Sequence, residues 1–239
     1  MNKMTRHALT TTAVVVCALG AGVPANAQMA ASICNDIQCT GGDDVLVLDN
    51  AAGDASAITG AISFSVAAFG YNFLVNTSQS KPVVGSASAP QLDLTFTVTS
   101  TGAAGNVFLY ASDTGFTLAP GSSLLSLGGT NSGGSGSVTG RAWGGSNNTA
   151  LSFSGANLIG SAIGPLTGLA FSGTNTALFG PTGIPYSLTI GTAISRATAG
   201  TTTGDLNLQI TPVPEPSTWA LMLMGPVLVG FVARRRRQR

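Results

Sequence analysis

The chain is poor in the residues that most often carry enzyme chemistry. Of its 239 residues, 8% are charged and 6% aromatic, and it contains one histidine, His7, and one glutamate, Glu215, each near an end of the chain. The intervening sequence therefore lacks the histidine of a Ser-His-Asp triad or a histidine zinc site, and the usual glutamate general acid. An aspartate pair is the remaining alternative, and no spacing selects one. We expect no enzyme activity.

Positive charge is also scarce in the central part of the chain. Residues 28–211 contain three basic side chains, Lys81, Arg141 and Arg196, against eight aspartates, and three minus eight gives a net charge of −5. Three scattered cations cannot neutralise a phosphate backbone, which argues against nucleic-acid binding. The whole-chain charge of +1 conceals an acidic centre and basic ends.

The N-terminal residues, 1–27, have the pattern of a secretory signal peptide. A basic start precedes an apolar run over residues 8–19, and the small-residue sequence ANA ends at Ala27. The apolar run is too short for a dependable membrane anchor. We expect export by the secretion machinery and cleavage after Ala27, which gives a mature protein that begins at Gln28.

Cysteine is scarce as well, with three residues in the whole chain. Cys17 lies within the predicted signal peptide, and Cys34 and Cys39 stand in the sequence CNDIQC. In an oxidising compartment this spacing favours a local disulfide. Its ring is small, so the bridge should hold the N-terminal segment and contribute less to the whole fold.

A polar motif, an apolar run and a basic cluster follow one another in residues 212–239. The motif is Pro214-Glu215-Pro216, the run covers residues 219–233, and the cluster begins with Arg234, Arg235, Arg236 and Arg237. The run is shorter than the ~20 residues that usually span a bilayer. Arginine side chains can reach back to the interface and hold the C-terminus in the cytoplasm. We therefore predict one C-terminal transmembrane helix over residues 219–233.

This order of features resembles the PEP-CTERM sorting signal of Gram-negative bacteria, and PEPSTWA, with Trp219 and Ala220, is similar to its PEPxxWA variant. The resemblance covers residues 213–239. It implies recognition by an exosortase, a membrane protease found in bacteria that make exopolysaccharide. It also implies an inner-membrane-anchored precursor with its body in the periplasm, and a final place at the cell surface or outside the cell. An ordinary, uncleaved anchor is the alternative.

The body, residues 28–211, is predicted to be a single β-rich domain. Polar and apolar residues alternate with the period of a half-exposed strand, most clearly over residues 92–99. Further strands are expected at residues 45–48, 62–66, 71–75, 106–110, 151–154, 186–190 and 205–210. Together they predict an all-β, antiparallel two-sheet sandwich, jelly-roll or immunoglobulin-like. The glycine- and serine-rich residues 128–145 are expected to form a long mobile loop or a weak boundary.

Two features of the body raise the question of a ligand. Four aspartates gather around one predicted strand and offer oxygen ligands for Ca²⁺, or else serve as turn formers: Asp43, Asp44, Asp49 and Asp54. No other cofactor is expected. Trp143, beside Arg141 in the glycine-rich segment, either stacks on a sugar ring or belongs to the core.

Taken together, these features predict an exported cell-surface or extracellular-matrix protein with a structural or adhesive role linked to exopolysaccharide. A carbohydrate-binding module is the alternative. A more distant one is an ice-binding protein that uses threonine-rich strand faces.

Overall fold

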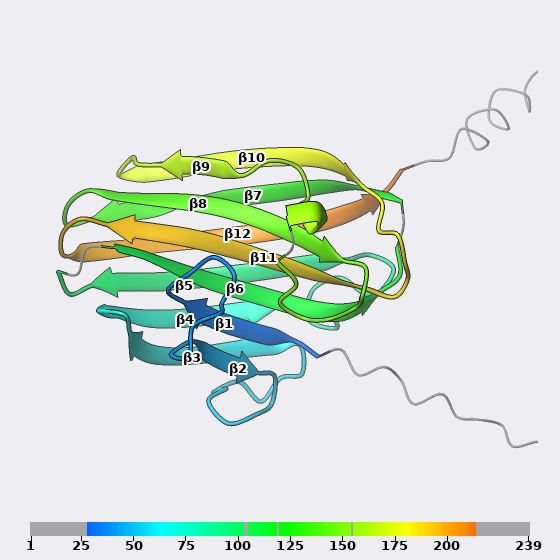
Figure 1. The fold of residues 1–239 in the computed structure, drawn as a ribbon, viewed down its shortest axis with the longest axis horizontal. Coiled ribbons are helices and arrows are strands. Elements are labelled where there is room, and N and C mark those ends of the chain that lie inside the picture. The colour runs from blue at the N-terminus through cyan, green and yellow to red at the C-terminus, as the bar shows by residue number, and fades with distance from the viewer. Residues whose placement is uncertain (1–27, 103–104, 119, 154, 214–239) are drawn as a thin grey trace, which may run out of the picture.

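The computed structural model describes residues 28–102, 105–118, 120–153 and 155–213, which form a sandwich of two six-stranded antiparallel sheets (Figure 1). Ala27 with the predicted signal peptide, the Pro-Glu-Pro motif, the predicted transmembrane helix and the arginine cluster lie outside these residues. Among the helices of the described part, none has the length and apolar character needed to cross a membrane.

Twelve strands and one short 3-10 turn make up the described chain. They are β1 (Ala30–Cys34), β2 (Val45–Leu48), β3 (Ala61–Ala68), β4 (Tyr71–Gln79), β5 (Gln91–Ser100), β6 (Gly105–Phe116), β7 (Gly121–Ser132), β8 (Gly136–Gly145), η1 (Gly155–Asn157), β9 (Ile163–Leu166), β10 (Ala170–Phe179), β11 (Tyr186–Arg196) and β12 (Gly200–Pro212).

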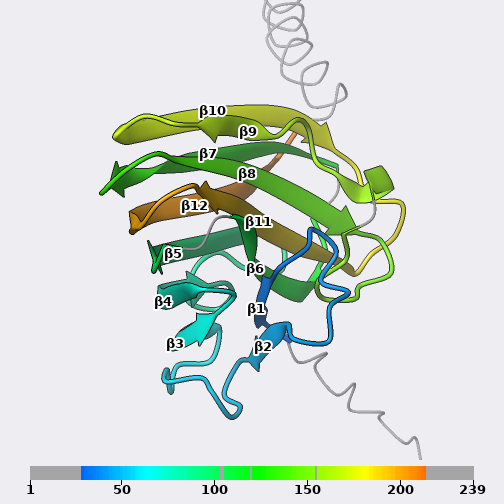
Figure 2. The same cartoon turned by 60° about the vertical axis from the view of Figure 1, so that its left-hand side comes forward.

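The strands from β5 to β12 follow jelly-roll topology. Sheet A has the order β2-β1-β6-β11-β8-β9, and sheet B has the order β10-β7-β12-β5-β4-β3. Consecutive strands from β5 to β8 alternate between the two sheets. Later in the chain, β11 inserts between β6 and β8 in sheet A, and β12 inserts between β7 and β5 in sheet B, as in a double Greek key. β1 and β2 extend sheet A beside β6, while β3 and β4 extend sheet B beside β5 (Figure 2). The predicted all-β sandwich is confirmed, in its jelly-roll form.

The core lies between the sheets and follows from the alternation in the sequence. In β5, Leu92, Leu94, Phe96 and Val98 are at most 1% exposed, while the threonines and Asp93 between them point to the outer face. Because successive side chains of a strand point to opposite faces, one buried face fixes the register of the pairing. β12 repeats the pattern on the neighbouring strand, with Leu206 and Leu208 fully buried.

The predicted mobile loop over residues 128–145 is wrong, because these residues belong to β7 and β8 and the tight turn between them. Glycine is needed within the strands since large side chains of neighbouring strands occupy the space of a side chain. A Cβ atom at Gly129 would lie 2.6 Å from the Phe171 ring, and one at Gly144 would overlap the Phe179 ring. The turn itself uses Gly133, whose φ of 71° suits glycine.

The predicted strand at residues 151–154 is also not found among the described residues. Leu151 has a φ of 56°, a left-handed conformation that lies outside the β region of a regular strand. It begins a loop that returns Phe153 to the outer face of sheet A, where that ring packs against Tyr110 and Trp143.

Candidate functional site

Three central strands of sheet A form a trough on its outer face. β11 lies between β6 and β8, and its outward residues there are small: Gly191 stands between Tyr110 and Arg141, and Ala193 between Phe108 and Thr139. Because larger side chains of the flanking strands rise on both sides of these small ones, the sheet surface is hollowed along β11.

This trough contains a groove of about 340 Å³, which we call the Arg141 groove. Phe108, which is half-buried, lines it together with Ile37, whose side chain is 40% exposed. The other lining residues are small or polar: Asn106, Ser137, Thr139, Arg141, Ala193 and Ser195. The groove thus combines an aromatic ring, an aliphatic end, several hydrogen-bonding groups and one cation.

Arg141 differs from the other two basic side chains of the body. Lys81 pairs with Asp113 at 2.7 Å and is 13% exposed, and Arg196 is 1% exposed. The Arg196 guanidinium donates to Thr202 Oγ1 at 2.9 Å and to the carbonyl of Ser132 at 2.8 Å. The Arg141 guanidinium has no hydrogen bond or ion pair within the described part of the chain. It is therefore the cation left available to a ligand.

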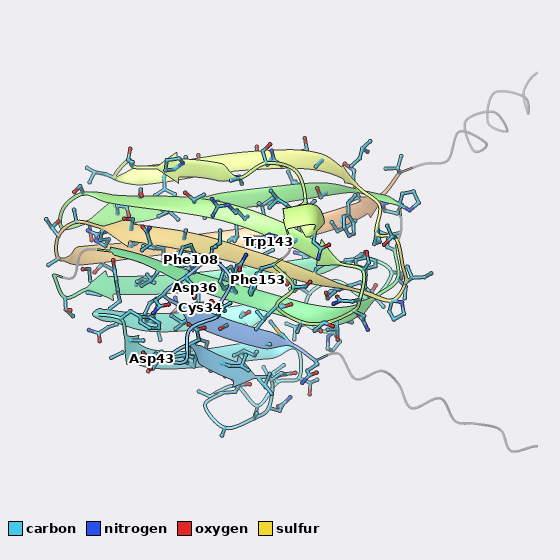
Figure 3. All side chains as sticks on the ribbon, in the orientation of Figure 1. Cys34, Asp36, Asp43, Phe108, Trp143 and Phe153 are labelled. Carbon is cyan, nitrogen blue, oxygen red and sulfur yellow. A yellow bond between two sulfur atoms is a disulfide. The ribbon has the colours of Figure 1, made fainter. Side chains whose placement is uncertain are left out.

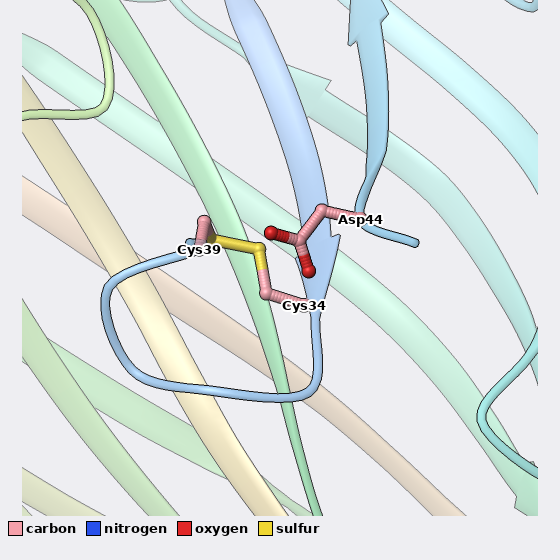
Figure 4. Close-up of side chains that lie close together, drawn as sticks. All are labelled: Cys34, Cys39 and Asp44. Atoms are coloured by element: carbon pink, nitrogen blue, oxygen red, sulfur yellow. A yellow bond between two sulfur atoms is a disulfide. The ribbon is translucent and has the colours of Figure 1, made fainter. Parts of the chain in front are cut away.

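A disulfide between Cys34 and Cys39 holds the loop that closes one end of the groove (Figure 4). Within this loop the Asp36 carboxylate accepts hydrogen bonds from the backbone amides of Gln38, at 2.8 Å, and Thr40, at 3.1 Å. These bonds, chiefly that from Gln38, lower the pKa of Asp36. The Tyr110 hydroxyl donates to the carbonyl of Ile37 at 2.8 Å and so fastens the loop to the sheet.

Trp143 does not line the groove, and of its two predicted roles the structure has the one in which it is buried in a core cluster. It lies in β8, is 4% exposed, and packs with Tyr110 and Phe153 at ring-centroid distances of 5.8 and 5.7 Å. Figure 3 shows Phe108, Trp143 and Phe153 gathered over the same face of sheet A. Trp143 is therefore the core of a small cluster covered by loops and has no free face for a sugar. Burial raises the pKa of Tyr110, although the nearby Arg141 acts in the opposite direction.

The four aspartates considered for calcium do not come together. β2 separates Asp43 and Asp44 from Asp49 and Asp54, and at about 3.3 Å per residue Asp44 and Asp49 stand roughly 16 Å apart along the chain. In the described residues the one group of three potential ligands is Asp44 with Cys34 and Cys39, whose sulfurs are joined to each other (Figure 4).

The two aspartates after β2 support turns. Asp54 accepts hydrogen bonds from the amides of Ser56, Ser63 and Asn50 at 2.8 to 3.0 Å, and Asp49 accepts one from Gly60 at 2.8 Å. These contacts are those of turn-forming carboxylates. Calcium binding stays a prediction, and the structure gives it no site built from all four residues.

A second, larger cavity of about 760 Å³ lies at the end of the sandwich near the start of the described chain. It is lined by residues that include Gln28, Met29, Asp49, Lys81 and Pro82. Burial, followed by the negative charges of Asp54 and Asp113, raises the pKa of Asp49. The cavity has no aromatic lining residue, so it offers no stacking surface for a sugar ring.

The sequence reasoning singled out Arg141 but missed the rest of its groove. Phe108, Thr139 and Ala193 lie on three different strands and come together only through the pairing of β6, β11 and β8. One signal was available in the sequence: Gly191 and Ala193 are two small residues in alternate positions, which puts them on the same face of a strand.

Two solved structures are similar to this chain at a low level. One is a carbohydrate-binding module, TmCBM27, from a study of specific mannan recognition; it is 12% identical, with a TM-score of 0.33, over 63% of this chain and 89% of that one. The other is the enzymatically active domain of bacteriophage CBA120 tailspike protein 4, 12% identical, with a TM-score of 0.31, over 60% of this chain and 20% of that one. Neither similarity is close enough to indicate a ligand or an activity.

No curated protein matches the chain. The tail does match a known family: residues 212–237 fit the PEP-CTERM protein-sorting motif. This segment contains Pro214, Glu215, Pro216, Trp219 and Ala220 and the four arginines that follow the apolar run. The C-terminal region of the chain therefore carries a PEP-CTERM protein-sorting motif, the signal of an exported protein that an exosortase processes.

Proposed function

We propose that this chain is an exosortase-sorted surface or matrix protein with a structural or adhesive, non-enzymatic role linked to exopolysaccharide. The sorting motif at residues 212–237 is the observation that carries the proposal. The body supports the proposal, because its disulfide is of the kind that forms in oxidising compartments outside the cytoplasm, and its charge content is low.

The proposed route begins with removal of residues 1–27 and ends with cleavage of the tail. In the precursor, residues 219–233 cross the inner membrane, residues 234–237 stop in the cytoplasm, and the body, residues 28–211, stands in the periplasm. The exosortase then cuts near the motif in residues 212–239, and the body reaches the surface or matrix.

Intact-mass analysis of surface protein tests this route. We expect wild-type protein to lack the tail, and Glu215→Ala with Pro216→Ala to leave an uncleaved precursor in the inner membrane. Ser217→Ala with Thr218→Ala, at the two variable positions of the motif, is the matched control and should be processed normally. Wild-type surface protein that still ends at Arg239 would show that the tail is only an anchor.

A carbohydrate-binding module is the second candidate, and the Arg141 groove favours it. Phe108 supplies an aromatic ring of the kind on which sugars stack, and Asn106, Thr139 and Ser195 supply hydrogen-bonding groups. Arg141 matches a carboxylate in a two-point contact, so the groove suits glycans that contain uronic acids better than neutral ones.

Calorimetric titration with uronic-acid and neutral oligosaccharides tests this second candidate. We expect Phe108→Ala to abolish binding of both, and Arg141→Gln to weaken binding of the uronic acid by about tenfold or more. Asp205→Asn, on the outer face of sheet B, is the control and should bind as the wild type does. Equal affinity of the wild type and both groove variants would remove the groove from consideration.

Ice binding stays a distant alternative, tied to one face of sheet B. Thr97, Thr203 and Thr130 are register neighbours across β5, β12 and β7, and the Thr130 and Thr203 hydroxyls lie 2.7 Å apart. Saturable thermal hysteresis that Thr203→Leu removes would support this alternative, and its absence would end it.

A further inference from the structure

The sandwich has four sheet edges, and three of them are protected. In sheet A the edge strands β2 and β9 have 4 residues each, and β9 contains Pro165. In sheet B the edge strand β3 is covered by the loop before it: the Ser63 amide donates to Asp54 Oδ1 at 3.0 Å and its carbonyl accepts the Ala55 amide at 2.7 Å. Short strands, proline and covering loops are the usual means of blocking an edge.

The fourth edge, β10, is neither short nor interrupted by proline, and the loop contact that it makes, from the Ser161 amide to Asn175 Oδ1 at 3.2 Å, engages a side chain and not the strand backbone. It is 10 residues long, pairs with β7 in an unbroken register, and contains neither proline nor a charged residue. On its other side no strand of the described chain pairs with it. Its Leu178 is 83% exposed and Leu169, just before it, is 75% exposed, the two highest values among large apolar side chains of the described residues.

An unprotected edge strand can bind another strand through backbone hydrogen bonds. The sequence of β10 itself is suitable for that second strand. The sequence AFSGTNTALF has no charged residue, so two copies of β10 can pair, parallel or antiparallel, without like-charge repulsion. A twofold interface also needs only one surface patch, which pairs with itself. We propose that β10 is the docking site for β10 of a second copy of this chain, in an antiparallel pair that joins the two B sheets.

The outer-face residues fix the register of this pair. Ser172, Thr174, Thr176 and Leu178 point outward, and residues opposite each other in an antiparallel pair share a face. Two registers overlap equally well, one centred on Thr174 and one on Asn175. The first sets Leu178 against Ala170 of the second copy, and the second sets Leu178 against Ser172. Burial of apolar surface favours the first, with Thr174 opposite its own counterpart.

Cysteine cross-linking of the full-length chain in its own host tests the interface and its register. Thr174→Cys should give a disulfide-linked dimer on a non-reducing gel after mild oxidation. Ser172→Cys and Thr176→Cys should each stay monomeric alone and cross-link when the two variants are produced together with different tags. Thr203→Cys, on the same face but in the middle of the sheet, is the matched control and should not cross-link.

A second measurement covers the apolar contact. Combining Thr174→Cys with Leu178→Glu should reduce the cross-linked fraction strongly, because each of the two copies loses one leucine contact. Each lost contact should raise the dissociation constant of the dimer about tenfold, and the two together about a hundredfold. A monomeric Thr174→Cys protein with a freely labelled thiol overturns the proposal. So does a thiol protected in a monomer and exposed when residues 214–239 are removed, since the tail would then be the occupant.

Discussion

Asp93 and Asp205 form a carboxylate pair on the outer face of sheet B, and this pair gives a sign-specific prediction. Asp93 is half-buried in β5 and accepts a hydrogen bond from Nδ2 of Asn207, its register partner, at 3.3 Å. Asp205 of β12 lies diagonally across from it and interacts with it electrostatically. Burial, then the hydrogen bond and negative charge of Asp205, raise the pKa of Asp93 from 3.8 to about 6. The folded protein therefore holds this proton more tightly than the unfolded chain does.

The sign and size of the effect on stability follow from that difference. A carboxyl group with a raised pKa in the folded state contributes stability below pH about 4, and this contribution is lost as the pH rises through about 6. A shift from 3.8 to about 6 corresponds to about 3 kcal/mol at about 1.36 kcal/mol per pH unit. Because Asp93 is only half-buried, solvent screening reduces the expected loss to about 1 kcal/mol.

Urea unfolding at pH about 4 and about 8 measures this loss. We expect Asp93→Asn to stabilise the body relative to the wild type at pH 8 and to have little effect at pH 4. Asp205→Asn should reduce the same pH dependence, because it removes the charge that faces Asp93. If Asp93→Asn is more destabilising at pH 8 than at pH 4, the two carboxylates do not repel each other and the reasoning is refuted.

Three further predictions concern packing and processing. Trp143→Ala should cost about 3–5 kcal/mol in urea unfolding, and a loss below about 1 kcal/mol would contradict its burial. Gly144→Val should cost about 1–3 kcal/mol by collision with Phe179, while Gly155→Ala, which meets open space, should stay within about 0.5 kcal/mol. N-terminal sequencing of exported protein should begin at Gln28, and a start at Met1 would contradict export.

The strands that the sequence predicts well are those with one wet and one buried face. β5 and β12 show the alternation directly, because polar residues on one side are partly or fully exposed and leucine, isoleucine or phenylalanine on the other fill the core. β11 alternates in the same way in sequence, although its Ser187 and Thr189 are buried in the structure. β7, β8 and β10 are not predicted as strands, because glycines in these segments are more typical of loops. Their glycines are required because other side chains occupy the space that a side chain would need: Phe171 beside Gly129 and Phe179 beside Gly144. Only the fold brings these residues together.

The sequence identified two residues near the candidate site but not which of them is accessible. Arg141 and Trp143 are two residues apart in one strand and share its outer face, so the sequence could not tell which of them stays open. The difference comes from the loop that carries Phe153, which covers Trp143 and leaves Arg141 in the groove. The four aspartates considered for calcium do not share one site for a simpler reason, because β2 keeps the two pairs apart.

The groove and the β10 edge lead to a joint prediction, since they lie on different sheets and do not compete. A dimer through β10 of sheet B leaves the Arg141 groove of sheet A open in both copies. Two grooves on one particle bind a long polymer more tightly than a short oligosaccharide, by a factor of about 100 or more where both sites can engage. Leu178→Glu should therefore weaken binding to polymeric uronic-acid glycan and leave binding of a short oligosaccharide unchanged. Ile58→Glu, at another exposed apolar position (61% exposed), is the control. Equal loss for polymer and oligosaccharide in Leu178→Glu would mean that the substitution disturbs the groove, and the bivalent arrangement would then be wrong.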